Sequence, residues 1–311
     1  MMNITAFQKK AKPWMMPLAM ISGTFFHEAI SRFEWIVPYL IFTMLFITFC
    51  RIRPSQLRIS RMIWTLLAIQ IFGAILVFAA LRPLGLTLAQ SVFICVLCPT
   101  ATAAPVVTGM LGGDIAKVAT YSIVSNLAVA ILAPVLFVVC GNLSAHADFV
   151  EEFLSIAMRV APIIVFPLLA AFTLYFVCRP VHTLVNSVQG VSFYLWSVAL
   201  IVVVGRAVSF ILAEPPSAVP LMLAMSALAL LVCLLQFCAG RIIGRRYGDA
   251  VSGAQGLGQK NTVLAIWMSL AYLDPLASIG PASYIVWQNT INSAQLYYRM
   301  KQPRHRVAEN K

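Results

Sequence analysis

Apolar residues run along this chain in long stretches that short polar segments separate. A membrane-spanning helix needs about 20 predominantly apolar residues, and on that measure we expect about ten such segments. They cover approximately residues 14–30, 35–50, 62–81, 88–111, 116–140, 154–177, 188–212, 217–240, 250–272 and 279–298. The pattern predicts an all-α membrane protein with about ten transmembrane helices.

Polar residues, prolines and glycines interrupt two of these segments. The fourth contains CPTATAAPVVTGMLGG (98–113) and is expected to break near 100–105, and the ninth contains VSGAQGLGQKNTVLA (251–265) and is expected to break near 258–261. Free backbone groups at membrane depth are tolerated only where they are buried in protein or line a water-filled cavity. Two interrupted segments in corresponding halves are typical of secondary transporters built from repeats.

The long polar loop after the fifth segment, GNLSAHADFVEEF, divides the chain into two halves, 1–142 and 143–311. Each half then holds five segments, and an odd number makes the second half run inverted relative to the first. In inverted five-helix repeats, the interrupted helices 4 and 9 cross face to face near the midplane. This symmetry follows from spacing, because the halves share no strong residue-level identity.

Composition agrees with a membrane protein, since 61% of residues are hydrophobic and 10% are charged, whereas soluble domains carry about 25% charge. A net charge of +12 can indicate nucleic-acid binding, but the basic residues gather in one set of loops, so we expect no nucleic-acid partner. The positive-inside rule then predicts a multi-pass protein of the cell (inner) membrane with both termini cytoplasmic. The N-terminal QKKAKPW resembles the start of a signal peptide, but the loop pattern requires this segment to remain as the first helix.

The two interruptions predict an anion site. A half-helix that begins at a break directs its N–H groups and positive dipole end at the centre, and two such ends attract a carboxylate. Lys260 adds a full positive charge about ten residues into its segment, where snorkelling to an interface is difficult. In the alternative interpretation, the glycines and prolines only kink or pack helices, and Lys260 pairs with a carboxylate, for which Glu28 is the nearest candidate. A further alternative is a lysine that is neutral at rest, because burial disfavours the charged form.

The predicted substrate and ion site combines both interruptions with polar residues of neighbouring segments. Interhelical hydrogen bonding is the alternative explanation for each of those polar residues individually. The site residues are Gln259, Lys260, Asn261, Thr262, Thr102, Pro105, Gln70, Ser122, Asn126 and Asn289, with Ser125, Gln288, Asn292 and Ser293 on the same helix faces.

The seven cysteines are scattered, mostly inside apolar segments. Cys95 and Cys98 form the only CxxC pair, and no histidine or second cysteine pair completes a metal site. We interpret them as small apolar packing residues, with a soft-metal or arsenical site as the alternative. No cofactor and no resident metal are predicted.

At the interruptions the chain resembles the bile acid:sodium symporter family, within the bile acid, arsenite and auxin-efflux type of transporters. CPTATAAPVVTGMLGGD is similar to that family's CPGGTASN-type crossover, GLGQKNTVLA to its EVGMQNSGLA-type crossover, and IVWQN to its VWHN. Gln70 falls where a sodium-site glutamine would lie. The resemblance implies a panel domain (first, second, sixth and seventh helices) and a core domain (the rest). It also implies transport of organic anions by alternating access.

The chain departs from this family at the positions of the sodium ligands. At the first crossover it has Ala104 and Pro105 in place of the family's Ser and Asn. In the fifth helix it has Val118 and Ser122 in place of Ser and Thr, and at the second crossover Gly256 and Lys260 in place of Glu and Gln. Alanine, glycine and valine side chains supply no oxygen ligand, and a lysine repels the ion. The hypothesis is that the Lys260 ammonium stands in for sodium.

We therefore expect a secondary active transporter of organic anions, either bile-acid-like or small carboxylates, whose sodium coupling is doubtful because of Lys260. The alternative is a sodium-independent or proton-coupled efflux carrier of a weak acid or oxyanion, since proline at the first crossover also resembles auxin-efflux carriers. The expected partners are the substrate anion, the lipid bilayer and a coupling ion, either a proton or sodium.

Two further classes fit the sequence less well. A membrane enzyme needs a nucleophile and base, or a metal cluster, at membrane depth, but all four histidines lie in or near loops, so no enzyme is predicted. A channel or sensor would need a filter repeat or a soluble output domain, and neither is recognisable in the sequence.

Overall fold

The computed structural model describes residues 18–50, 59–141, 149–187 and 189–301. Within these ranges the chain forms helices, turns and short loops, with no strand beyond one isolated bridge. Six helical stretches there are long and apolar enough to cross a membrane: His27–Phe49, Arg61–Leu84, Ile115–Cys140, Phe153–Val177, Tyr194–Ala213 and Pro216–Arg246. The protein is thus an all-α, multi-pass membrane protein, as the sequence predicts.

The helices follow one another with short connections. Residues 18–25 are helical, and they precede α2 (His27–Ile30), η1 (Ser31–Ile36), α3 (Val37–Phe49), α4 (Arg61–Leu81), η3 (Arg82–Leu84), α5 (Leu86–Leu97), α6 (Ala104–Met110), α7 (Ile115–Cys140), α8 (Phe149–Val177), α9 (Arg179–Ser187), α10 (Gln189–Ala213), η4 (Pro216–Ala218), α11 (Val219–Arg246), α12 (Ala250–Gly258), α13 (Thr262–Tyr272), η5 (Pro275–Ser278) and α14 (Ile279–Lys301).

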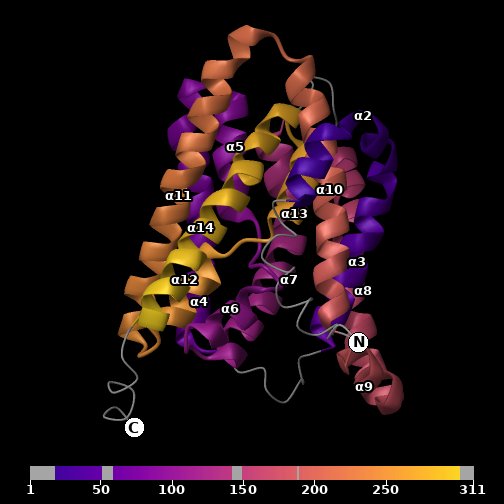
Figure 1. Cartoon of the computed structure of the whole chain (residues 1–311), viewed down its shortest axis with the longest axis vertical. Coiled ribbons are helices and arrows are strands. Elements are labelled where there is room, and N and C mark those ends of the chain that lie inside the picture. Colours follow the sequence, from indigo (N-terminus) through magenta and orange to yellow (C-terminus); the bar gives the residue numbers. More distant parts are fainter. Residues whose placement is uncertain (1–17, 51–58, 142–148, 188, 302–311) are drawn as a thin grey trace, which may run out of the picture.

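Two groups of helices lie side by side (Figure 1). In one group α3 packs against α8 and α10, and α10 packs against α2. In the other, α11 packs against α5, α12 and α14, and α4 packs against α5 and α7. Contacts of α7 with α8 and of α13 with α10 join the two groups.

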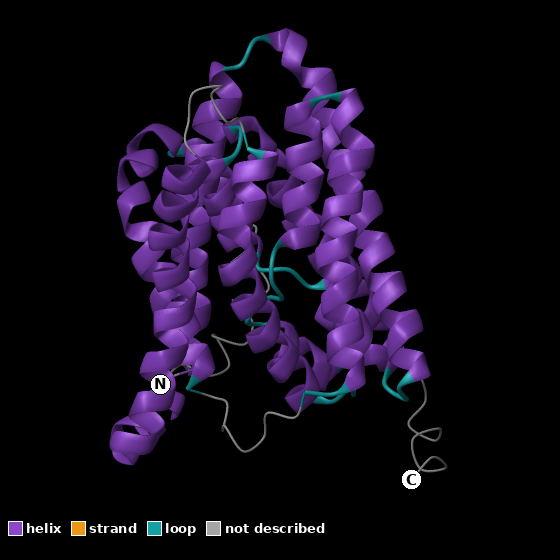
Figure 2. Ribbon diagram, turned by 180° about the vertical axis from the view of Figure 1, so that it is seen from behind, coloured by secondary structure: helices purple, strands orange, loops and turns teal. Residues whose placement is uncertain are grey.

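The long helices run between two ends of the molecule (Figure 2). We call the end where α7 ends and α11 begins the upper end, and the end where α7 begins and α11 ends the lower end, as drawn in Figure 1. Two teal connections cross in the middle of Figure 2, away from either end. These are the breaks between α5 and α6 and between α12 and α13.

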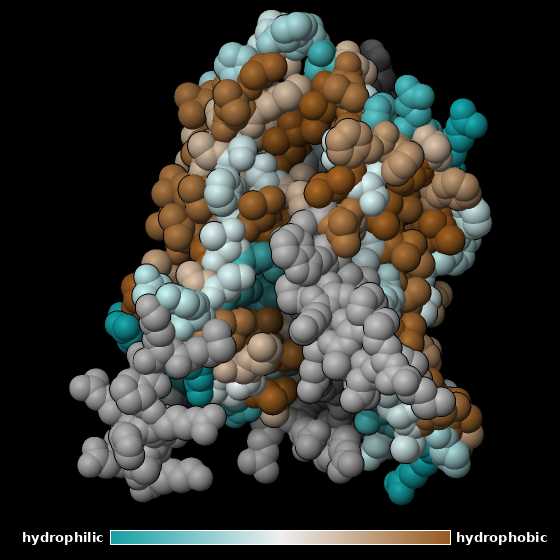
Figure 3. Space-filling view, viewed as in Figure 1, coloured by the Kyte–Doolittle hydropathy of each residue, from teal (hydrophilic) through white to brown (hydrophobic). Residues whose placement is uncertain are grey.

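Apolar side chains cover much of the outer surface (Figure 3). Large exposed examples come from both helix groups: Phe25, Phe72, Leu76, Met158 and Leu223. Such extensive exposed apolar surface would be costly in water, and a bilayer is the solvent that suits it.

The close approach of α11 and α12 depends on glycine. A Cβ atom on Gly240 would collide with the Gly253 carbonyl, and a Cβ on Gly253 would collide with the Gly240 carbonyl. Small residues let membrane helices approach backbone to backbone. This contact fixes α12, and therefore the break that follows it, against the long helix α11.

One connection differs from the prediction. The expected loop before the seventh segment contains helix α9, in which the buried ring of His182 packs edge-on against Tyr175 at 5.2 Å. Arg179 lies over the same tyrosine ring at 5.9 Å. These contacts fix α9 against the end of α8. The length of the apolar segments alone does not predict this helix. The predicted start of the first segment, residues 14–17, lies outside the described residues.

Candidate functional site

The two breaks cross and pair with each other. Thr100 and Lys260 form an antiparallel bridge, flanked by hydrogen bonds from Ala101 N to Gln259 O (2.9 Å) and from Asn261 N to Pro99 O (2.8 Å). Each break therefore supplies partners for backbone groups that the other leaves free of its helix. This is how irregular backbone is tolerated at membrane depth, and both breaks lie where the sequence predicts them.

Local sequence explains where the second half of each broken helix begins. Asn261 is the N-cap of α13, and its Oδ1 accepts a hydrogen bond from Leu264 N at 3.3 Å. Asparagine is among the preferred N-cap residues. Pro105 lies in the first turn of α6, where a missing N–H costs nothing.

Lys260 lies at the crossing and is 1% exposed. Its Nζ donates a hydrogen bond to Val96 O at 2.9 Å, in the last turn of α5. A helix C-terminus carries a partial negative charge, so a cation there is favourable. The ammonium group thus faces the negative end of α5, whereas the sequence suggested that it adds to the positive N-terminal ends of the half-helices.

No carboxylate pairs with Lys260 in the described part of the chain, where the ion pairs involve other groups. The thiols of Cys95, Cys98 and Cys233 lie near enough to interact with it electrostatically. Among described residues, no group of three or more His, Cys, Asp or Glu side chains could hold a metal ion. Among the described residues, Lys260 is therefore the one side chain at the crossing that can carry a full charge, and its described neighbours are neutral groups.

Gln288 of α14 holds the backbone of Lys260 from both sides. Its Oε1 accepts from Lys260 N at 2.8 Å, and its Nε2 donates to Lys260 O at 3.3 Å. One turn earlier on α14, Tyr284 donates from its hydroxyl to Gly258 O at 2.8 Å. The amide and the phenol replace the backbone partners that the broken helix lacks.

Gln70 of α4 plays a similar part for the first break. Its Nε2 donates to Leu97 O (2.7 Å) and Cys98 O (3.2 Å), while its Oε1 accepts from Tyr121 Oη (2.6 Å) and Ser125 Oγ (3.1 Å). All four hydrogen-bonding positions of the amide are filled. The free carbonyls at the end of α5 are thereby shared between Gln70 and Lys260.

The structure brings together some of the predicted site residues and separates others. Gln70, Ser122, Gln259, Lys260 and Asn261 all contribute side-chain or backbone hydrogen bonds at the crossing. Thr262 and Pro105 are buried at the starts of α13 and α6, and Thr102 is half-buried in the first break.

Two predicted residues bond mainly within their own helices. Asn126 donates to Ser122 O and leaves its buried Oδ1 without a partner. Asn289 is half-buried and donates to Ile285 O, so it contributes no hydrogen bond to the crossing. Its neighbour Gln288 bonds at the crossing instead. The sequence VWQN alone does not indicate which of the two amides faces the crossing.

A row of amide side chains leads from the crossing toward the lower end. Gln255 Nε2 donates to Asn292 Oδ1 (2.9 Å) and Gln295 Oε1 (3.3 Å), and Arg241 donates to Gln295 Oε1 (3.5 Å). The spacing of Gln288, Asn292 and Gln295 along α14 is the sequence signal, because steps of four and three share a helix face.

Three buried polar atoms on this row have no hydrogen-bond partner among the described residues: Gln255 Oε1, Asn292 Nδ2 and Gln259 Oε1. Buried polar groups are nearly always hydrogen-bonded, to protein or to ordered water. We call this row, from Arg241 to Lys260, the polar row. Its unpaired atoms are suited to binding water.

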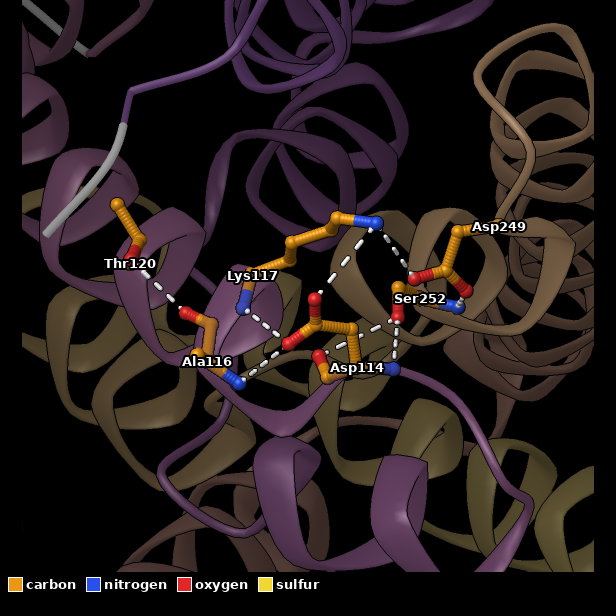
Figure 4. Close-up of polar contacts among 6 residues, drawn as sticks. All are labelled: Asp114, Ala116, Lys117, Thr120, Asp249 and Ser252. Carbon is orange, nitrogen blue, oxygen red and sulfur yellow. Dashed lines mark hydrogen bonds and ion pairs between the residues drawn. The ribbon is translucent and has the colours of Figure 1, made fainter. Parts of the chain in front are cut away.

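A second polar cluster lies at the lower end and joins α7 to α12 (Figure 4). Asp114 is the N-cap of α7, and Asp249 is the N-cap of α12. Lys117 Nζ lies 3.3 Å from Asp249 and 3.6 Å from Asp114, and Ser252 Oγ accepts from Asp114 N at 2.8 Å. We call these four residues the lower cluster.

Asp249 stays ionised in this cluster. Its partial burial would by itself raise the pKa of the carboxyl, but hydrogen bonds from Ser252 and Lys117 favour the charged form, and the pKa is lowered overall. The cluster therefore holds the start of α12 with paired charges, and Asp249 lies eleven residues before Lys260.

Comparisons with known proteins do not assign this arrangement to a family. No protein-family model matches the chain, and no curated protein matches it. The resemblance of the two crossovers to bile acid:sodium symporters stays a prediction from the quoted motifs.

Proposed function

We propose that the protein is a secondary active transporter of organic anions that works by alternating access and does not require sodium. One observation carries the proposal: a buried lysine, without a carboxylate partner in the described part of the chain, at the crossing of two broken helices. Ionisable residues at membrane depth are costly and mark substrate or ion pathways. Broken helices that meet at the midplane are the usual binding site of secondary transporters.

The position of the ammonium group supports independence from sodium. Lys260 Nζ binds a carbonyl in the last turn of α5, and the carbonyls of Leu97 and Cys98 are next to it in the chain. Carbonyl oxygens at a broken helix end are the kind of group that holds a sodium ion in transporters. In our proposal the tethered ammonium fills that role, and the substrate anion is attracted by its charge.

The packing also suits alternating access. We propose that the helices form two inverted five-helix repeats, and that residues 18–25 with α2, α3, α8 and α10 form the panel against which the other helices move. That group packs mainly within itself. The lower end is proposed to be cytoplasmic, since Lys117, Arg241, Arg245 and Arg246 lie there.

A second candidate is proton-coupled efflux of a weak acid, and the polar row favours it. Water bound at the unpaired amide atoms would connect Lys260 with the lower end. The charge state of the lysine would then follow the pH on that side. The groups around Lys260 in the described residues are the Cys95, Cys98 and Cys233 thiols and the neutral Gln288 amide, and the far end of the row holds Arg241.

A thermal-shift screen of the purified protein against organic anions tests the proposal. We would use acetate, benzoate and cholate, each in sodium and in potassium buffers at pH 6 and pH 8. A ligand that binds only the folded state raises its stability by RT ln(1 + [L]/Kd). We expect stabilisation that is equal in both cations, and uptake into proteoliposomes with the same independence of sodium.

Lys260→Gln is the matched variant, because it keeps an N–H donor on a side chain that is one bond shorter but removes the charge. We expect it to lose most anion binding. Sodium-dependent uptake in both the wild type and Lys260→Gln would disprove the role of the lysine. Binding that changes with pH in the wild type but not in the variant would favour the proton-coupled candidate.

A further inference from the structure

A cavity of about 550 Å³ opens at the upper end between α7, α8 and α13. Its walls come from the last turn of α7, the first half of α8 and the end of α13, including Phe137, Ser155, Arg159, Tyr272 and Asp274. The volume is within the range of small-molecule sites, roughly 300–1,000 Å³. None of the residues that form the crossing lines this cavity.

Arg159 places a full charge inside this cavity and within a membrane helix. It is the seventh residue of the candidate span Phe153–Val177, roughly 9 Å along the helix axis from Phe153. Charged groups at such positions pair with one another or face a water-filled cavity. Among the side chains that the structure describes, no carboxylate forms an ion pair with Arg159.

Asp274 is the other charged side chain on the cavity wall, and its carboxylate is already engaged. Its Oδ2 accepts from Thr87 Oγ1 at 2.6 Å, and its Oδ1 accepts from Leu276 N at 3.0 Å. The Asp274 N–H in turn donates to Gln90 Oε1 at 3.0 Å. Asp274 therefore fixes the loop after α13, and it leaves the guanidinium of Arg159 available to a ligand.

The wall beside Arg159 includes one half-buried aromatic ring, that of Tyr272, and the buried Phe137 (1% exposed) supports this ring from behind. The rings of Phe137 and Tyr272 are stacked, with centroids 5.6 Å apart and planes 17° from parallel. Trp267 packs edge-on against Tyr272 at 5.7 Å, which fixes the orientation of the tyrosine ring. A guanidinium binds a carboxylate through two parallel hydrogen bonds, and an apolar ring system next to that carboxylate would contact the half-buried ring of Tyr272.

We propose that this cavity is a binding site for an organic anion, whose carboxylate pairs with Arg159 and whose apolar body rests on the ring of Tyr272. The inference rests on the proposed transport function, because the site would be the place where the substrate anion docks at the upper end. It adds the substrate class: a carboxylate that carries a ring, rather than a small oxyanion. Arg159 would act as the specificity-determining residue of that docking step.

Titration calorimetry on the purified full chain tests the site, with benzoate, cyclohexanecarboxylate and cholate as probes and benzamide as the uncharged control. We expect Arg159→Gln to raise the Kd of the carboxylates by about tenfold or more, and Arg159→Lys to raise it less. Arg32→Gln is the matched control, since Arg32 lies near the same end in η1 and does not line the cavity. It should leave the Kd unchanged, and benzamide should bind weakly to every variant.

The outcomes separate this site from the transport function. If the wild type binds the carboxylates and Arg159→Gln binds them within twofold of the wild type, the cavity proposal is wrong and transport through the crossing stands. Retained binding of benzamide at the affinity of benzoate would also overturn the cavity proposal. If the wild type neither binds nor transports any of the three carboxylates, both proposals fail.

Discussion

Two lysines of this protein lie in opposite surroundings. Lys260 is 1% exposed at the crossing of the breaks, and its ammonium group has a neutral carbonyl as its hydrogen-bond partner. Lys117 lies in the lower cluster with a side chain that is 38% exposed, between the carboxylates of Asp114 and Asp249. The buried charge lacks a described counter-ion, while the half-exposed charge has two.

In the proposed function, this difference separates a structural charge, Lys117, from a functional one, Lys260. A half-exposed ion pair such as that of Lys117 contributes about 0–1 kcal/mol, and it also helps to cap two helices, so the fold explains its presence. An unpaired buried charge costs several kcal/mol after relaxation. Gln288 already satisfies the backbone of Lys260, and the ammonium group itself bonds Val96 O at the end of α5. We propose that a bound anion is the further reason to keep a charge there.

Replacing each lysine by methionine gives the largest expected contrast. Lys260→Met removes the charge and keeps most of the volume, so we expect anion binding and transport to fall by about 100-fold, equivalent to about 2.7 kcal/mol. Its unfolding free energy should change by less than about 1 kcal/mol, because the lost desolvation cost offsets the lost hydrogen bond. Uptake and thermal unfolding measured on the same preparations check both values.

Lys117→Met should give the reverse result. Transport should stay within twofold of the wild type, while the unfolding free energy falls by about 0.5–1 kcal/mol as the ion pairs with the two aspartates are lost. Equal transport losses in the two variants would show that Lys260 has no special role. A strongly destabilised Lys260→Met would mean that the fold itself needs this charge.

Gln288→Leu tests whether the crossing is held by side chains. The substitution removes two buried hydrogen bonds to the backbone of Lys260, so the unfolding free energy should fall by about 2–4 kcal/mol. Asn289→Leu is the control, since Asn289 is half-buried and its side chain bonds within α14, and it should cost less than about 1 kcal/mol. Equal thermal shifts for the two variants would contradict the assignment of Gln288.

The positions of the breaks could be predicted from sequence because the rule is local. Prolines, glycines and polar residues inside an apolar segment cannot continue a lipid-exposed helix, so breaks near 100–105 and 258–261 are predictable. Their mutual pairing follows from the expected crossing of inverted helices. The halves 1–142 and 143–311 as repeats, and the count of ten helices, stay predictions.

The direction of the Lys260 side chain could not be predicted, because it depends on contacts that are distant in sequence. Its Nζ partner, Val96, is 164 positions away, and the Gln288 amide is 28 positions away. The choice between Gln288 and Asn289 depends on the rotation of α14 about its axis. The cavity at Arg159 forms where α7, α8 and α13 come together. The sequence places Arg159 near a helix end but does not show that these helices meet, so it predicts no site there.

Asp249→Ala tests the other side of the comparison, at the lower cluster. Alanine removes the N-cap hydrogen bond to Ser252 N (3.0 Å) and the ion pair with Lys117. Loss of such a cap costs about 0.5–2 kcal/mol, and we expect a decrease of about 1–2 kcal/mol in the unfolding free energy with anion affinity unchanged. Denaturation and binding measured together check this, and a tenfold change in affinity would mean that the cluster acts on the crossing.

The smallest expected effect is the pH dependence of the same carboxylate. The pKa of Asp249 is lowered in the folded state by its hydrogen bonds to Ser252 and Lys117, so its contribution is fully present above the unfolded aspartate pKa of about 3.9. It is lost as the pH falls through the lowered folded value. Asp249→Asn keeps a capping oxygen but cannot ionise, so it should be less stable than the wild type by about 0.5 kcal/mol at pH 7. The gap should close as the pH falls from about 4 through the lowered folded pKa. If the stability difference between the wild type and Asp249→Asn stays constant as the pH falls, the carboxylate charge contributes nothing to stability. Lys117, like Lys260, would then be held by neutral contacts.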